Sequence, residues 1–595
     1  MRESQTPALV EVDASANITD FVVRNATDRP ALVVYRRKVG SAWHDVTAAD
    51  FLAEVQALAK GLVAAGVGPG DRVGLMARTR YEWTLTDTAI WFAGAVTVPI
   101  YETSSADQVQ WILGDSGAVA VVVESPELLA TVEQVRGELP ALAHTWVVDG
   151  GDLETLAASG GGVSDDDLEQ RRSAAGTDDL ATIIYTSGTT GRPKGCELTH
   201  GNFVALTENA VKRIDQVVQA EGASTLLFLP LAHVFARFIQ VLCMAGGATM
   251  GHTADIKQLL PDLAEFQPSF LLAVPRVFEK IYNSAEQKAE GDGRGKIFRT
   301  AAETAIAYSK AQDSGSAGLP LRLRYALFDK IVYPKLRAAM GGRAQYAVSG
   351  GAPLGERLGH FFRGIGLTVL EGYGLTETTA PHSVNVPEKT KIGTVGPSLP
   401  GNAVRIADDG EILLKGPHVF RGYWNNPTAT AEAVVDGWFH TGDLGSLDDD
   451  GYLKITGRKK EILVTAGGKN VAPAVLEDRL RAHPLVSPCI VVGDAKPYVA
   501  ALVTLDEEML PAWLKNNGLP EMSPKEAAQH EAVRAAVQEA VDDANKAVSR
   551  AESIRRFELL TTDFTVESGH LTPSLKLKRN VVMDDFAEAV DGLYA

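Results

Sequence analysis

Cysteine is scarce in this sequence: its 595 residues include only Cys196, Cys243 and Cys489, which lie far apart. No two of them form a CxxC pair, and none belongs to a Cys/His cluster. This spacing excludes a structural zinc site of the usual kind and a disulfide framework. Unpaired thiols are typical of a reducing compartment, so we expect a cytoplasmic protein.

Long apolar runs are also missing. No uninterrupted stretch reaches the roughly 18 residues that a membrane-spanning helix needs, and the nearest candidate, residues 226–250, contains His233 and Arg237. The first residues, MRESQTPALVEVD, lack the apolar core of a secretory signal. We therefore expect a soluble protein without a transmembrane segment. Peripheral contact with a membrane surface stays open.

The chain has no excess of basic residues. It contains 57 Lys and Arg against 75 Asp and Glu, a formal net charge of −18. A nucleic-acid-binding protein usually carries a basic surface, so nucleic acid is not an expected partner. The 45% hydrophobic and 22% charged residues are typical of a globular chain, and the length predicts two or more domains.

Helical and strand-like patterns alternate along the sequence. Residues 49–64 place apolar side chains at helical spacing, and a Gly-Pro-Gly turn follows. Short β-like runs occur at 73–76, 118–123, 146–148, 181–185, 226–229 and 270–274. Such runs between helices predict an α/β fold with buried parallel strands.

Three other segments have distinct compositions. Residues 158–178, rich in Gly, Ser and Asp, are predicted to be an exposed loop. Residues 505–555, rich in Ala and charge, are predicted to be helical and surface-facing. The Gly- and charge-rich crossing at 440–460 fits a domain boundary or, equally, a hairpin loop inside one domain.

The most informative segment is YTSGTTGRPKG at residues 185–195. Its glycines let backbone N–H groups approach an anion, its hydroxyls add donors, and Lys194 adds a positive charge. It is not a Walker A loop, because Pro193 stands where the second glycine should be and Gly195 replaces Ser or Thr. The segment predicts a loop that binds a polyphosphate.

With the segments that follow it, this loop resembles the adenylate-forming superfamily of acyl-CoA synthetases, luciferases and peptide adenylation domains. The matching segments, in order, are YTSGTTGRPKG at 185–195, YGLTET at 373–378, TGD at 441–443, GRKKE at 457–461 and TPSLKLKR at 572–579. The resemblance spans nearly the whole chain. It implies an α/β fold with a large N-terminal domain of several subdomains and a smaller, mobile α+β C-terminal domain.

The resemblance also implies roles for individual residues. Thr376 would contact the α-phosphate of ATP, and Glu377, with Thr186, would bind Mg²⁺. Asp443 would accept hydrogen bonds from the ribose hydroxyls, and Ser349, Gly350, Gly351, Ala352 and Tyr373 would form the adenine slot. The implied nucleotide-binding residues are Thr186, Ser187, Gly188, Thr189, Thr190, Gly191, Lys194, Gly350, Gly351, Ala352, Glu371, Gly372, Tyr373, Gly374, Thr376, Asp443 and Arg458.

The segment TPSLKLKR at 572–579 contains the implied catalytic lysine. We assign it to Lys576 rather than Lys578, because Lys576 keeps the family's spacing to Arg579, although Leu575 stands where Gly is common. The family's hinge falls at Lys460, which divides the chain into domains 1–458 and 459–595. Gly467 corresponds to a glycine lining the path of the CoA thiol.

Several stretches resemble long-chain fatty acid–CoA ligases in particular: LPLAHVFAR at 229–237, VPRVFEKIY at 274–282 and GGRAQYAVSGGAP at 341–353, with a helical region between residues 283 and 340 that shorter family members lack. His233 resembles the histidine beside the acyl carboxyl. Some long-chain ligases carry a gating Trp where Arg237 stands, so any gate here must be built differently. Val234, Phe235, Phe238 and residues 270–278 are candidates for lining the acyl tunnel.

The implied activity is ATP- and Mg²⁺-dependent conversion of a long-chain fatty acid to acyl-AMP and then, with CoA, to acyl-CoA. Two alternatives stay open: an acyl-AMP ligase that loads a carrier protein, and a non-catalytic protein that binds an adenylate or a lipid. The sequence leaves chain-length preference and oligomeric state undetermined.

Overall fold

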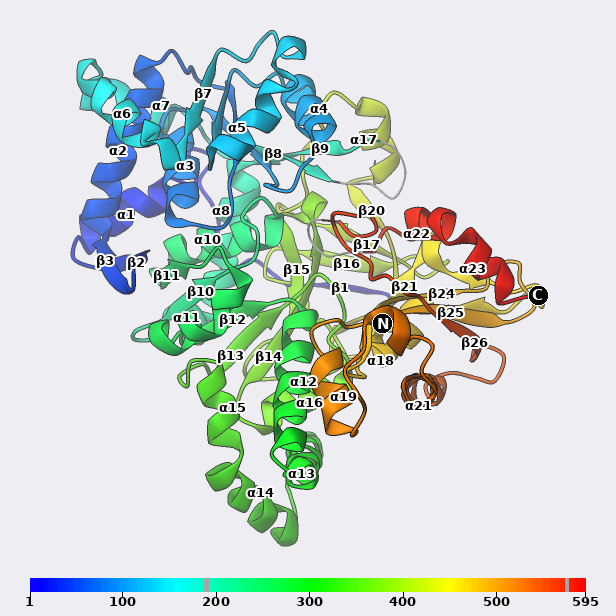
Figure 1. Ribbon diagram of the computed structural model, residues 1–595. Helices are drawn as coiled ribbons and strands as arrows, with labels where there is room; N and C mark the ends of the chain where they lie inside the picture. The colour runs from blue at the N-terminus through cyan, green and yellow to red at the C-terminus, as the bar shows by residue number, and fades with distance from the viewer. Residues whose placement is uncertain (187–191, 573–576) are drawn as a thin grey trace.

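The computed structural model describes residues 1–186, 192–572 and 577–595. Figure 1 shows helices α1, α2 and α3 at the upper left, the orange to red C-terminal segment at the right, and the N-terminus with β1 beside that segment. Among the described residues, no helix combines the length and apolarity that crossing a bilayer requires.

The first large sheet has seven strands in the order β18-β9-β8-β5-β4-β6-β7. Its strands are β4 (Arg72–Met76), β5 (Val96–Ile100), β6 (Ala120–Val123), β7 (His144–Val147), β8 (Leu180–Thr186), β9 (Lys194–Thr199) and β18 (Gly422–Tyr423). Strands β7, β6, β4, β5 and β8 are parallel, which confirms the predicted buried parallel strands. Strands β9 and β18 are antiparallel additions.

Helices cover this sheet, as its apolar composition requires. They include α2 (Ala48–Ala64), α3 (Tyr81–Phe92), α4 (Ala106–Ser116), α5 (Pro126–Glu133) and α8 (His200–Arg213). Helix α2 confirms the helix predicted at 49–64. Its N-terminus is a capping box, in which Thr47 and Asp50 each accept a hydrogen bond from the other's backbone N–H.

Two four-stranded sheets extend the N-terminal region. One contains β10 (Ser224–Leu227), β11 (Thr249–His252), β2 (Val33–Val39) and β3 (Ala42–Thr47), and the other contains β12 (Phe270–Ala273), β13 (Tyr346–Ser349), β14 (Thr368–Leu375) and β15 (Ala380–Val384). Their helices are α1 (Asp20–Asp28), α10 (Val234–Gly246), α11 (Leu259–Phe266), α12 (Pro275–Gly291), α13 (Gly295–Asp313), α14 (Leu319–Ile331), α15 (Tyr333–Ala339) and α16 (Glu356–Gly364).

A six-stranded sheet follows. It is formed by β1 (Glu3–Gln5), β16 (Ala403–Ile406), β17 (Glu411–Lys415), β19 (Val434–Val435), β20 (Trp438–Leu447) and β21 (Leu453–Arg458). Strands β20 and β21 form an antiparallel hairpin. The polar residues 448–452 therefore form the turn of this hairpin. Of the two interpretations of residues 440–460, the structure shows the hairpin loop.

Residues 459–595, called the C-terminal segment below, have their own apolar core. Their sheet consists of β24 (Val486–Val492), β25 (Val499–Leu505) and β26 (Ile554–Leu559). Their helices include α18 (Pro473–Leu480), α19 (Leu510–Asn516), α21 (Glu531–Asn545), α22 (Arg579–Asp585) and α23 (Ala587–Gly592). The predicted helix within 505–555 is confirmed, but the surface-facing assignment is wrong for one side of it. Val533, Val537 and Val541 of α21 are buried in this core.

The loop predicted at 158–178 is also wrong, because residues Asp165–Ala174 form helix α7. Ser164 caps the helix by accepting a hydrogen bond from the Asp167 N–H, and acidic residues in the first turn favour the positive end of the helix dipole. Leu168 and Arg172 are the buried side chains of the helix. Capping and charge placement therefore outweigh the loop-like composition.

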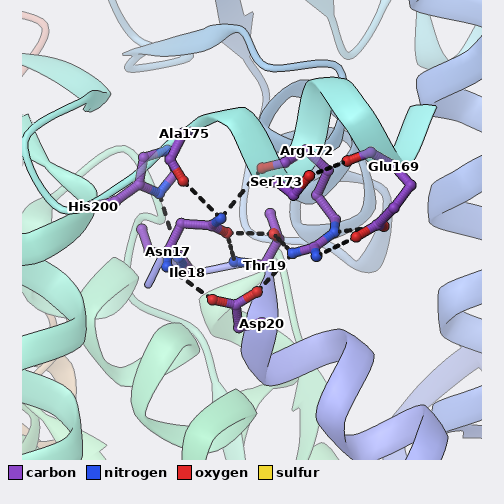
Figure 2. A network of polar contacts seen from close by, with 9 residues as sticks. All are labelled: Asn17, Ile18, Thr19, Asp20, Glu169, Arg172, Ser173, Ala175 and His200. Carbon is purple, nitrogen blue, oxygen red and sulfur yellow. Dashed lines mark hydrogen bonds and ion pairs between the residues drawn. The ribbon is translucent and has the colours of Figure 1, made fainter. Parts of the chain in front are cut away.

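Figure 2 shows how residues 17–20 form hydrogen bonds and ion pairs with α7 and with His200 of α8. The Arg172 guanidinium donates to Asp20 Oδ1 at 2.7 Å and to Thr19 Oγ1 at 2.8 Å. The Asn17 amide donates to the carbonyls of Arg172 and Ala175, and the Ile18 N–H donates to His200 Nδ1. The network links α1, α7 and α8, and α8 directly follows the predicted phosphate-binding hairpin.

Candidate functional site

Strands β8 and β9 form the hairpin that carries the predicted phosphate-binding loop. Thr186 pairs with Lys194 at the end of the hairpin next to the loop. Trp111 of α4 supports the loop's far side, because its indole N–H donates to the Pro193 carbonyl at 2.9 Å and its ring lies 4.7 Å from the Arg192 guanidinium. Five predicted loop residues lie outside the described part of the chain: Ser187, Gly188, Thr189, Thr190 and Gly191.

Tyr423 of β18 connects two of the predicted site residues. The Lys194 Nζ atom lies 4.8 Å from the centre of the Tyr423 ring, and the Tyr423 hydroxyl donates to Glu377 Oε1 at 2.8 Å. Burial and the nearby Glu377 carboxylate raise the pKa of Tyr423, so the phenol stays neutral and can donate. One side chain therefore holds a carboxylate oxygen and supports a lysine from a different strand.

Thr186 and Glu377, the two residues predicted to bind Mg²⁺, both lie close to Cys196. Burial raises the pKa of the Cys196 thiol, the Glu377 charge raises it further, and a hydrogen bond with Thr186 opposes the shift. In the part of the chain that the structure describes, no three His, Cys, Asp or Glu side chains are grouped to hold a metal ion. A divalent ion here would need oxygen ligands from a bound phosphate as well, which suits Mg²⁺.

The turn at Thr376–Thr378 has a constrained backbone. Thr379 and Ala380 have φ values of +54° and +83°, and a Cβ atom on Gly374 would lie 1.7 Å from the Ala380 carbonyl oxygen. Position 374 therefore requires glycine. The Thr379 hydroxyl donates to the His418 carbonyl at 2.8 Å, which anchors the turn from behind. Positive φ values outside glycine are costly and recur at functional sites.

The predicted adenine-binding residues lie at the adjacent ends of β13 and β14, where Ser349 pairs with Glu371. Gly351 has a φ of +85°, and Gly350, Ala352 and Gly372 complete this edge. The Ser349 hydroxyl is buried without a hydrogen-bond partner among the described residues. A buried orphan hydroxyl at this edge fits a ligand with polar ring atoms.

Glu371 is a buried carboxyl at the same edge. It accepts a hydrogen bond from the Leu354 N–H at 3.0 Å, and burial raises its pKa to about 7. Burial also raises the pKa of Asp478 of α18, the Arg481 charge opposes this shift, and the charges of Glu477, Glu279 and Glu371 add smaller increases.

Asp443 accepts hydrogen bonds from two of the other predicted residues, Tyr373 and Arg458. The Tyr373 hydroxyl donates to Asp443 Oδ2 at 2.6 Å, and Arg458 Nε donates to Oδ1 at 2.9 Å. Antiparallel pairing places Asp443 opposite Arg458 in the β20–β21 hairpin. Since the Asp443 side chain is buried, its carboxylate is held in one orientation with both oxygens engaged.

His233 lies at the N-terminus of α10, where its Nδ1 accepts a hydrogen bond from the Phe235 N–H at 3.2 Å. Phe235 approaches the adenine edge, because a Cβ atom on Gly350 would lie 3.4 Å from its ring. Val234 and Phe238, two of the tunnel candidates, are core residues. Phe235, two residues after His233, thus lies beside the predicted nucleotide residue Gly350.

Arg237 does not face the site. Its side chain has no exposed surface and donates to both carboxylate oxygens of Asp87 on α3 and to the Thr182 hydroxyl. The rings of Trp83 and Trp91 lie on it at 5.5 and 5.1 Å. Arg237 is therefore part of the core.

The structure gives fewer contacts for the predicted hinge residue and the predicted C-terminal residues. Lys460 is exposed in the single turn Lys459–Glu461, and Gly467 is exposed with only Thr465 Oγ1 near the position of a Cβ atom, at 3.9 Å. Lys576 lies outside the described residues. The chain on either side of it is joined by a bridge between Leu571 and Leu577.

Local sequence patterns did not indicate two residues. Tyr423 contacts the site residue Glu377, and Asp87 pairs with the core residue Arg237. Each contacts a predicted residue that is distant in the chain: Tyr423 lies 46 positions from Glu377, and Asp87 lies 150 positions from Arg237. Local spacing carries no signal for such contacts.

Family models match most of the chain. The family model described as AMP-binding enzyme matches residues 20–424, and the model of the AMP-binding enzyme C-terminal domain matches residues 460–595. Long-chain-fatty-acid–CoA ligase FadD15 of Mycobacterium bovis is 50% identical over 100% of both chains.

Solved structures share the fold. The anthranilate CoA ligase AuaEII in complex with anthranoyl-AMP has a TM-score of 0.73 at 20% identity, covering 97% of this chain and 99% of that one. The o-succinylbenzoate CoA synthetase of Bacillus subtilis with ATP and a magnesium ion has a TM-score of 0.65 at 21% identity, covering 94% and 98%.

Proposed function

The chain belongs to the AMP-binding enzyme family, and from this premise we propose that it is a long-chain fatty acid–CoA ligase. In the first half-reaction, a fatty acid carboxylate oxygen forms a bond to the α-phosphorus of ATP, and the bond to pyrophosphate breaks. In the second, the CoA sulfur forms a bond to the acyl carbon and AMP leaves with the electron pair.

The convergence of Lys194, Tyr423 and Glu377 carries this proposal. A lysine and an oriented carboxylate, joined through one neutral phenol, suit a polyphosphate with its counter-ion. Both reactants are anions, so the site must offset their repulsion as well as align them.

The proposed reaction and the family resemblance together suggest a role for each group. Lys194 offsets the charge of the leaving phosphates, and the Thr376 hydroxyl lies on the constrained turn beside Glu377. We assign Asp443 to the ribose hydroxyls, since Tyr373 and Arg458 already fix its carboxylate. His233 would orient the acyl carboxyl. Lys576 would stabilise the charge that moves from carboxylate to phosphate.

Glu377, with the Thr186 hydroxyl near it, would hold a Mg²⁺ ion together with phosphate oxygens. When bound, the ion neutralises phosphate charge. Lys460 would be the pivot between domains 1–458 and 459–595, with Gly467 facing the CoA thiol after rotation. An exposed residue in a single turn can absorb such a change in φ and ψ.

An AMP-formation assay over acids of increasing chain length, with and without CoA, tests the proposal. We expect turnover only with long-chain acids, and acyl-CoA only when CoA is present. Peak activity on acetate or aryl acids would refute the substrate class. Acyl-AMP accumulation without CoA turnover would favour the carrier-loading alternative, and no AMP from any acid would favour the non-catalytic one.

A further inference from the structure

Helix α14 (Leu319–Ile331) carries a row of exposed apolar side chains. Leu319, Leu323, Leu327 and Ile331 are 67%, 65%, 55% and 50% exposed. Because they recur every fourth residue, they lie along one side of the helix. Single exposed leucines are ordinary, but a continuous row is not, and contiguous apolar patches mark interaction surfaces. We call these four residues the leucine row.

The opposite side of α14 already has its partners. The Tyr325 ring stacks on Tyr308 of α13 with ring centres 3.8 Å apart, and Phe328 is buried beside Tyr333. These contacts fix the rotation of the helix, so the leucine row faces outward. Figure 1 shows α14 at the lower tip of the molecule, beyond α13 and α15.

The charge around the row is opposite to that of the whole protein. Residues 292–337 contain nine Lys or Arg and four Asp or Glu, a net of +5, in a chain whose net charge is −18. On α14 itself, Arg322, Arg324 and Lys330 are exposed beside the leucines. An apolar row with basic residues beside it is the composition of a helix that lies in the headgroup region of an anionic membrane.

We propose that the leucine row docks α14 onto an anionic lipid bilayer, with leucines at the acyl boundary and Arg322, Arg324 and Lys330 at the lipid phosphates. A second copy of the chain fits this surface poorly, since two copies joined through the row would bring like charges together. This surface lies outside the nucleotide site, so the inference does not depend on the proposed reaction.

Vesicle co-sedimentation without ATP, acid or CoA tests the proposal. The full chain is expected to bind vesicles of phosphatidylglycerol and phosphatidylcholine in equal parts, and to bind pure phosphatidylcholine much more weakly. Leu323→Glu should lower the partition coefficient about tenfold or more, since burying one leucine contributes at least that factor. Val39→Glu, at a residue 56% exposed on β2, is the matched control and should bind like the wild type.

A second measurement does not require loss of binding. All three native cysteines are buried, so a dye that senses polarity would label only Leu323→Cys or its control Val39→Cys. We expect a blue shift on adding anionic vesicles for the first and none for the second. Equal binding by Leu323→Glu and Val39→Glu, equal dye shifts, or no binding to anionic vesicles would overturn the proposal. A dimer in vesicle-free buffer that Leu323→Glu dissociates would overturn it as well.

Discussion

At the scale of single residues, Tyr423 is the contact with the most specific consequence. Tyr423→Phe keeps the ring beside Lys194 but removes the hydroxyl that holds Glu377 Oε1. A hydrogen bond to a charged group contributes about 1.5–3 kcal/mol, so we expect ATP–pyrophosphate exchange to fall roughly 10–100-fold. Calorimetric titration with Mg²⁺ and ATP should show weaker binding in parallel. Tyr333→Phe, which removes a buried hydroxyl bonded to the Ala301 carbonyl, is the control and should leave both unchanged.

The assignment of the catalytic lysine is tested at the same scale. Lys576→Ala should remove acid-dependent ATP–pyrophosphate exchange but spare thioester formation from supplied acyl-AMP, because the lysine is assigned to charge movement in the first half-reaction. Lys578→Ala is the matched comparison two residues away. If only Lys578→Ala loses ATP–pyrophosphate exchange, the catalytic lysine is Lys578 and not Lys576.

At the scale of elements, a buried ion pair joins α10 to α3. Neither Arg237 nor Asp87 has any exposed side-chain surface. Arg237→Met leaves the Asp87 charge buried and unpaired, so we expect a loss of about 3–5 kcal/mol in the free energy of unfolding by urea. Adding Asp87→Leu should restore most of that loss. Lys546→Met, which breaks the exposed Lys546–Asp543 pair, should cost less than about 1 kcal/mol.

The end of β14 gives an expected pH dependence. Burial raises the pKa of Glu371 from 4.5 to about 7, so the folded chain keeps a proton that the unfolded chain releases. Its contribution to stability is complete below pH 4.5 and decreases as pH rises to about 7, by on the order of 3 kcal/mol. Glu371→Gln should flatten this part of the curve of unfolding free energy against pH. An unchanged curve would show that Glu371 is already ionised at low pH.

At the scale of the whole molecule, ion pairs hold the C-terminal segment against α12. Arg276 pairs with Asp506 at 2.6 Å, and Lys280 pairs with Glu508 at 2.7 Å. Figure 1 shows α19 beside α12 in this arrangement. Both contacts are polar, which is compatible with the proposed rotation of the C-terminal segment about Lys460.

Arg276→Gln should therefore weaken the docking of the C-terminal segment. We expect trypsin to cleave near residues 459–469 about fivefold faster, which corresponds to roughly 1 kcal/mol for a partly exposed pair. Arg36→Gln breaks an ion pair with Asp45 inside the N-terminal region and should not change the rate. Equal rates for the two variants would contradict a docking role for Arg276.

Local patterns were sufficient for much of the fold. The spacing of apolar residues at 49–64 and the short apolar runs predicted α2 and the parallel strands, because burial on one or both faces dictates those periods. Composition failed at α7, where Ser164 and the acidic first turn stabilise a helix in a Gly- and Ser-rich stretch. Composition also placed α21 at the surface, although its valines are in the core.

The sequence by itself determined the fold class, the family resemblance and the residue types of the phosphate-binding segment, since these depend on local spacing and on five short segments in order. Only the tertiary structure decided that Tyr423 joins Lys194 to Glu377, that Arg237 is a core residue paired with Asp87, and that the leucine row of α14 faces outward. The physical reason is that each depends on contacts between distant segments, which packing selects and local spacing does not encode.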